Sequence, residues 1–134
     1  SKAVLTQWKK AGIGAHKIMC MGDEAEIEEL YNSLGKEFSN EIELYRSKPT
    51  YIEISHKLIS KKTGIDLLLE KSYPHLSIDN VVAFGDNYND IEMLKAVGLG
   101  VAVGNANVDV LEVANAITDT NKNDGVAKAI KEFF

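Results

Sequence analysis

Short apolar runs alternate with stretches of helical periodicity along the chain. In its first half the pattern predicts helices over residues 1–11 and 24–34 and strands over residues 16–21, 41–47 and 50–55. Gly35 is expected to end the second helix. Pro49 lies between the last two strands, a spacing that is compatible with a hairpin.

The second half is more regular. Its pattern predicts a helix capped by Ser60 with inner face Ile65, Leu68, Leu69 and Tyr73, strands over 80–84, 99–103 and 116–118, and helices over 88–97, 108–114 and 125–134. Strands that alternate with helices imply a parallel sheet with helices on both faces, an α/β architecture. We place the boundary between the two parts near residues 54–58, which divides the chain into 1–55 and 56–134.

Composition and charge limit the kinds of molecule that the chain is expected to bind and the setting in which it is expected to work. The 134 residues carry 15 Lys and Arg against 20 Asp and Glu, a net charge of -5, and no basic stripe, which argues against nucleic acid. A small phosphorylated ligand stays compatible with this charge. No basic N-terminal segment precedes an apolar stretch, and no window approaches about 18 consecutive apolar residues, so we expect no membrane span. The single cysteine, Cys20, forms no internal disulfide, and we expect a cytoplasmic setting.

The most informative segment runs from Phe84 to Asp90, with the pattern Gly-Asp-x-x-Asn-Asp. It lies where a buried strand ends and a helix begins, which is where open parallel sheets bind ligands. Asp86 and Asp90 are predicted to lie on the same side of this turn, close enough to need a neutralising cation. Hard oxygen ligands of this kind suit Mg²⁺. The alternative is that these residues only cap the helix.

Two further features accompany this segment. Lys61 opens a predicted helix, where a cation is slightly unfavourable to the helix dipole, although a solvated surface lysine is the simpler explanation. Gly104 and Asn105 end the next strand at the same edge of the sheet, and a plain turn also explains them.

Together these segments resemble one family in order and spacing. The matching residues are Lys61, Gly85 to Leu94, Val101 to Ala106 and Asn123 to Ala127. They are similar to the C-terminal half of a haloacid dehalogenase superfamily phosphatase of the Cof-like subgroup, which has a large inserted cap. The resemblance is specific over residues 50–134 and weaker over 1–50. It implies that 1–55 is the C-terminal portion of an α/β cap and 56–134 the second half of a Rossmann-like core.

The resemblance implies Mg²⁺-dependent hydrolysis of small phosphomonoesters, such as sugar phosphates or phosphorylated cofactors, through an aspartyl-phosphate. Carried over by position, Asp86 ligates Mg²⁺, and Asp90 supports the metal site and orients Lys61. Lys61 neutralises the phosphate, and Asn89 contacts the phosphate or Lys61. Asn105 is a further candidate for substrate binding. Such a site works by positioning and charge neutralisation.

The chain departs from the family pattern in one important way. Members begin with an Asp-x-Asp motif that supplies the nucleophile, and none occurs in these 134 residues. We therefore expect this chain to lack phosphatase activity by itself. Two alternatives remain: a non-catalytic phosphate- or metal-binding regulatory module, and a receiver domain like those of response regulators. The missing first strand predicts an exposed sheet edge and self-association.

Overall fold

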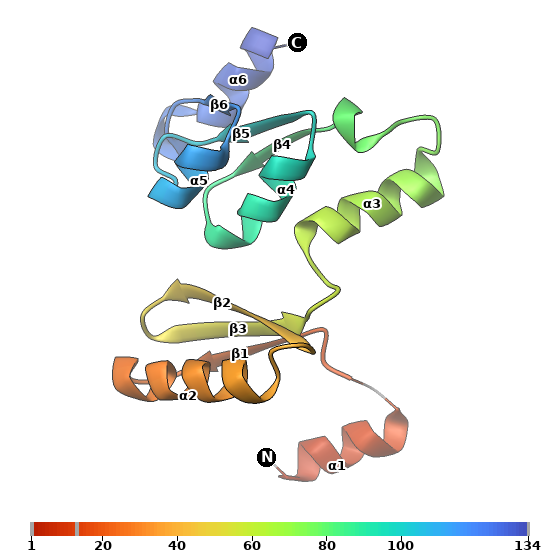
Figure 1. The fold of residues 1–134 in the computed structure, drawn as a ribbon, viewed down its shortest axis with the longest axis vertical. Coiled ribbons are helices and arrows are strands. Elements are labelled where there is room, and N and C mark those ends of the chain that lie inside the picture. Colours follow the sequence, from red (N-terminus) through yellow and green to blue (C-terminus); the bar gives the residue numbers. More distant parts are fainter. Residues whose placement is uncertain (1, 13, 134) are drawn as a thin grey trace. The chain divides into compact units, whose positions relative to one another are not determined.

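The structure, a computed structural model, describes residues 2–12 and 14–133. The chain divides into two compact units, Ser1–Lys57 and Leu58–Phe134. Each unit has its own three-stranded sheet (Figure 1). In the part of the chain that is described, no helix is long and apolar enough to cross a membrane.

The first unit is an antiparallel sheet with a helix along one face (Figure 1). Its elements are α1 (Lys2–Ala11), β1 (Lys17–Met21), α2 (Glu24–Glu37), β2 (Ile42–Lys48) and β3 (Tyr51–His56). The strand order is β1-β3-β2, with Cys20 of β1 opposite Ile52 of β3. Ile27 of α2 and Ile52 are almost fully buried and form the centre of this unit. The predicted hairpin of β2 and β3 is confirmed.

The helix α2 extends further than the sequence pattern predicts. It continues through Gly35 to Glu37 and ends where the amide of Phe38 donates to the carbonyl of Leu34, 2.8 Å away. A glycine inside a helix costs about 1 kcal/mol relative to alanine. Packing of the apolar face of α2 against the sheet outweighs this local preference, since most helix stability in proteins comes from tertiary contacts.

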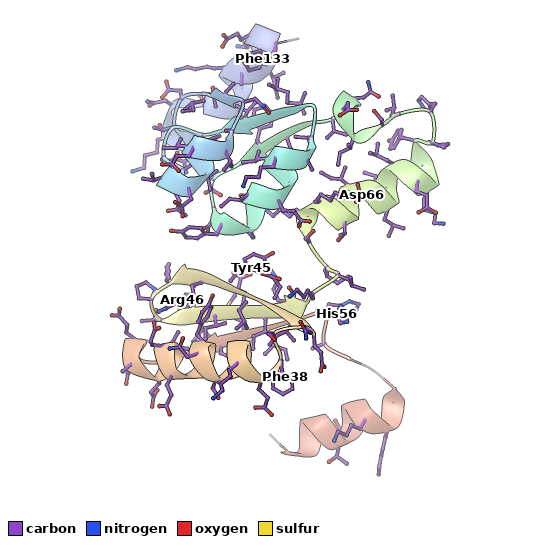
Figure 2. All side chains as sticks on the ribbon, viewed as in Figure 1. Phe38, Tyr45, Arg46, His56, Asp66 and Phe133 are labelled. Carbon is purple, nitrogen blue, oxygen red and sulfur yellow. The ribbon has the colours of Figure 1, made fainter. Side chains whose placement is uncertain are left out.

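Arg46 of β2 fastens the hairpin to α2 (Figure 2). Its guanidinium forms an ion pair with Glu28 and lies 5.6 Å from the centre of the Tyr31 ring. Its other terminal nitrogen donates to the carbonyl of Pro49 at 3.1 Å. One side chain therefore joins the helix, the strand and the hairpin turn.

The second unit is a parallel α/β fold, as predicted. Its elements are α3 (Lys61–Ser72), β4 (Val82–Gly85), α4 (Ile91–Ala96), β5 (Leu99–Ala102), α5 (Val108–Val113), β6 (Ala116–Ile117) and α6 (Gly125–Phe133), with 3-10 turns at Ile78–Asn80, Tyr88–Asp90 and Asn121–Asn123. The strand order is β4-β5-β6, so β5 is central and β4 lies at one edge. The helix predicted over 88–97 divides into the second 3-10 turn and α4.

The core of this unit lies between the sheet and α4 and α5. Its buried members are Ala83, Met93, Leu94, Val97, Ala102 and Val110. At Gly100 of β5 a Cβ atom would lie 2.4 Å from the carbonyl oxygen of Leu94, so the close approach of α4 to β5 requires glycine. The predicted inner face of α3 is only partly correct. Ile65 packs against the core, but Leu68 and Tyr73 are 53% and 46% exposed.

Candidate functional site

Three loops follow the carboxyl ends of the parallel strands. Asp86 follows β4, Asn105 follows β5 and Asp119 follows β6. Because these strands are parallel, their carboxyl ends meet at one edge of the sheet, the edge where open α/β sheets bind ligands. Hydrogen bonds between the loops make this edge one connected structure.

Asp90 is the buried centre of the first loop, with only 1% of its surface exposed. One carboxylate oxygen forms an ion pair with the Lys61 ammonium. The other accepts hydrogen bonds from the backbone amides of Asp86 and Asn87, at 3.0 and 3.1 Å. Burial acts to raise the pKa of Asp90, but the bonds from Lys61 and the two amides outweigh it and hold the pKa below its ordinary value. Asp90 is therefore ionised at neutral pH.

The capping explanation accounts for part of this arrangement. Asn87 and Asp90 form a capping box around the 3-10 turn, in which the Asp90 side chain receives the amide of Asn87. Capping does not explain Lys61, which lies 29 positions earlier in the chain and reaches the same carboxylate. The loop is thus both capped and paired with a distant cation.

Lys61 is held at the first turn of α3. Ser60 caps this helix as predicted, and its hydroxyl accepts from the amide of Thr63 at 3.2 Å. The Thr63 hydroxyl in turn accepts from the amide of Ser60 at 2.9 Å. The Lys61 side chain is 49% exposed, so its ammonium contacts Asp90 while still facing solvent. A cation in this position can also receive an anionic ligand.

Asp86 and Asn89 differ from Asp90 in exposure. The side chain of Asp86 is exposed, whereas Asn89 is half-buried. Within the described residues, no group of three or more His, Cys, Asp or Glu side chains could hold a metal ion. Both oxygens of Asp90 are engaged by protein donors, which leaves Asp86 to offer a carboxylate. One carboxylate is compatible with Mg²⁺, which keeps several waters and takes further oxygens from substrate phosphate.

Asn105 connects the second loop to the third. Its side-chain oxygen accepts from the amide of Asn121 at 2.8 Å, and the amide of Gly104 donates to the carbonyl of Asp119 at 3.2 Å. The Asn105 oxygen therefore holds the neighbouring loop, and its amide nitrogen is the group left for a ligand.

Sequence reasoning did not single out Asn107. Its side-chain nitrogen donates to the side-chain oxygen of Asn87 at 2.8 Å, which joins the second loop to the first. An asparagine before a short helix looks like an ordinary cap in the sequence. No local signal distinguishes it, because its partner lies 20 positions earlier.

The sequence profile of the haloacid dehalogenase-like hydrolases matches residues 1–130. The chain belongs to this family. The family assignment confirms the resemblance that the Gly-Asp-x-x-Asn-Asp segment indicated. It also favours the hydrolase fold over the alternative of a response-regulator receiver.

Named relatives of this haloacid dehalogenase-like chain include phosphatases. A 5-amino-6-(5-phospho-D-ribitylamino)uracil phosphatase of Bacillus subtilis is 41% identical over 120 residues, which are 88% of this chain and 47% of that protein. A solved haloacid dehalogenase-like hydrolase of Bacteroides thetaiotaomicron superposes with a TM-score of 0.77 at 36% identity, covering 90% of this chain and 45% of that one. A solved sugar phosphatase of subclass IIB has a TM-score of 0.71 at 29% identity, covering 87% and 42%.

This chain spans about half the length of the relatives that it matches. The fold and the family are thus shared with whole phosphatases, while the chain contains the loops of Asp86, Asn105 and Asp119 without an Asp-x-Asp motif.

Proposed function

We propose that this chain supplies the metal-binding and cation-bearing half of a phosphomonoesterase site. The observation that carries the proposal is the ion pair between Lys61 and buried Asp90, formed across 29 positions of sequence beside the exposed carboxylate of Asp86. A fixed cation next to a free carboxylate suits a ligand that is both phosphorylated and bound with a divalent metal.

Each side chain has a distinct task in this proposal. Asp86 is the metal ligand. Asp90 is a positioning residue, because its oxygens hold Lys61 and the Asp86–Asn87 turn instead of facing solvent. Lys61 neutralises the phosphate of the substrate and the charge that develops on the nucleophile. Asn89 and the side-chain nitrogen of Asn105 are the candidate hydrogen-bond donors to the substrate.

The carboxylate of Asp86 fits Mg²⁺ as one member of a larger ligand set. When bound, the ion would neutralise charge on the phosphoryl oxygens. Asp90 and Lys61 perform a separate task, since they keep one positive charge at a defined place with little reorganisation during phosphoryl transfer. The low pKa of Asp90 supports this task, because the carboxylate stays ionised and holds the ammonium at neutral pH.

The remaining chemistry requires a nucleophilic aspartate, and the Asp-x-Asp motif expected to supply it does not occur in these 134 residues. We propose that residues 1–55 are part of the cap and 56–134 the second half of the core. The nucleophile would come from a segment with the Asp-x-Asp motif that pairs at the edge of β4 to which no strand of the described residues is bonded. The substrate would be a small phosphorylated metabolite, a class to which the named substrates of the relatives belong.

The test compares the 134-residue chain with a fusion to the N-terminal part of a relative that carries Asp-x-Asp. Release of inorganic phosphate from p-nitrophenyl phosphate is measured with Mg²⁺. We expect no turnover by the chain alone and turnover by the fusion, abolished by Asp86→Ala and reduced by Lys61→Met. Lys62→Met is the matched control, since Lys62 pairs with Asp66 on the same helix. Turnover by the fusion that survives Asp86→Ala would contradict the proposal.

A non-catalytic binding module is the second candidate, because the exposed carboxylate of Asp86 beside the Lys61 ammonium would suit binding of phosphate with a divalent metal even without a nucleophile. It predicts that the chain binds inorganic phosphate in the presence of Mg²⁺. It also predicts that an otherwise folded fusion remains inactive. Calorimetric titration with phosphate, followed by the turnover assay on the fusion, separates the two candidates.

A further inference from the structure

Asn107 is the cap residue of α5, yet its side chain makes no hydrogen bond to that helix. Asparagine in this position usually accepts a bond from an amide of its own first turn. Here the side-chain nitrogen instead donates to Asn87 in the loop after β4, 2.8 Å away. The residue thus gives up local capping for a contact between two loops.

The backbone of Asn107 contacts the same loop. Its amide donates to the carbonyl oxygen of Asp86 at 3.0 Å. Side chain and backbone of one residue therefore hold two consecutive residues, Asp86 and Asn87. Asp90 adds a second set of hydrogen bonds, because its carboxylate accepts from the amides of the same two residues.

The acceptor in this contact is fully used. The side-chain oxygen of Asn87 receives the Asn107 nitrogen and also the amide of Tyr88, each at 2.8 Å. The same side chain also takes part in the capping box with Asp90, so its acceptor oxygen is satisfied by protein donors. The Asn87 side chain consequently has one preferred orientation, although it lies in a loop at the rim of the sheet.

We propose that Asn107 is a positioning residue that fixes the Asp86–Asn87 turn and thereby the direction of the Asp86 carboxylate. The turn connects β4 to a 3-10 turn, and its residues Asp86 and Asn87 are polar and not buried, so its order depends on hydrogen bonds from neighbours. A carboxylate held in one direction binds a metal ion without first losing loop entropy. This last consequence rests on the proposed function, whereas the fixing of the turn does not.

The decisive variant is Asn107→Ser. Serine is as good a helix cap as asparagine, but its hydroxyl is too short to reach Asn87. A role limited to helix capping therefore predicts no change, and a positioning role predicts a looser turn. Asn40→Ser is the matched control, because Asn40 is an exposed asparagine in the other unit.

The first readout is the rate of amide hydrogen exchange, which is measured by NMR on the 134-residue chain. Loss of one hydrogen bond should speed exchange at the amides of Asp86 and Asn87 by about three- to tenfold. The amide of Val101 in the central strand serves as an internal reference and should not change. In an Asn87→Ala background the Asn107→Ser substitution should have no further effect. Unchanged exchange at both loop amides in Asn107→Ser would overturn the proposal.

The second readout is Mn²⁺-induced broadening of resonances near Asp86. Asn107→Ser should need a higher Mn²⁺ concentration for half-maximal broadening than the wild-type chain and Asn40→Ser, and equal midpoints would overturn the link to metal affinity. Wild-type broadening that Asp86→Ala does not remove would contradict the proposed function instead. The exchange rates decide the role of Asn107 in either case.

Discussion

Gly85 and Asp90 approach each other so closely that a Cβ atom on Gly85 would lie 2.6 Å from the Cβ of Asp90 and 2.9 Å from its carboxyl carbon. The Asp90 side chain therefore occupies the space that a side chain at position 85, at the end of β4, would need. The same added atom would lie 3.0 Å from a methyl group of Leu94 in the core. The first position of the Gly-Asp-x-x-Asn-Asp segment thus has a steric role.

The variant Gly85→Ala should push Asp90 away from the turn and disturb its contacts with Lys61 and the two amides. Overpacking of this kind typically costs about 1–3 kcal/mol, measurable as a lower midpoint of urea unfolding. Gly64→Ala is the control, because Gly64 lies within α3 with no atom within 4 Å of its added Cβ. That variant should gain roughly 0.5–1 kcal/mol from helix propensity. A similar loss of stability in both variants would argue against the steric role.

Removal of the Lys61 charge should raise the pKa of Asp90. Burial alone favours the neutral carboxyl, and Lys61 provides the largest opposing contribution. The measurement is an NMR titration of the Asp90 carboxyl carbon in the wild-type chain and in Lys61→Met. Lys62→Met removes a cation one position further along α3 and should leave the pKa of Asp90 unchanged. An unchanged pKa of Asp90 in Lys61→Met would show that the Lys61 ammonium does not stabilise the ionised carboxylate.

The loop after β6 should lose stability in acid. Asp119 accepts from the Lys128 ammonium at 2.6 Å, from the amide of Thr120 at 2.7 Å and from the side chain of Asn123 at 3.1 Å, and these bonds lower its pKa to about 2. A depressed pKa stabilises the fold above the unfolded value of 3.8, and this contribution disappears as the pH falls toward about 2.

The corresponding experiment follows urea unfolding of the wild-type chain and Asp119→Asn between neutral pH and the acid limit. The wild-type chain should be the more stable one above the unfolded pKa, and the difference should shrink as Asp119 becomes protonated. Lys128→Met should raise the pKa of Asp119 and shift this loss to higher pH. A difference that is constant with pH would show that the charge of Asp119 contributes nothing.

The free edge of β4 should promote association of the isolated chain. Within residues 2–12 and 14–133, the parallel sheet ends at β4, whose other side pairs with β5. Unpaired strand edges readily pair with another chain. Sedimentation velocity over a concentration series should reveal species larger than a monomer, and fusion to the N-terminal part of a relative should suppress them. A single monomeric species at all concentrations would contradict this expectation.

Local pattern was sufficient for most elements and for the position of the turn that carries Asp86 and Asp90. The apolar run before Gly85 and the periodicity after it predicted a strand followed by a helix, and the alternation of such elements predicted a parallel sheet. The errors arise where packing overrides local preference. Gly35 lies inside α2 because that helix is held against the sheet, and Leu68 of α3 is exposed although its spacing suggests an inner face.

The sequence by itself determined the family, the parallel α/β arrangement and the strand ends that carry Asp86 and Asn105, because these depend on periodicity and on motifs of adjacent residues. Only the tertiary structure decided that Asp90 is buried while Asp86 is exposed. The family resemblance implied that Asp90 orients Lys61, and the structure gives the form of this contact, a direct ion pair across 29 positions of sequence. Only the tertiary structure identified Asn107 as the partner of Asn87, 20 positions away along the chain. Such pairs form only when folding brings segments that are distant in the sequence together at one edge of the sheet. The spacing of residues along the chain does not predict which of them will be in contact.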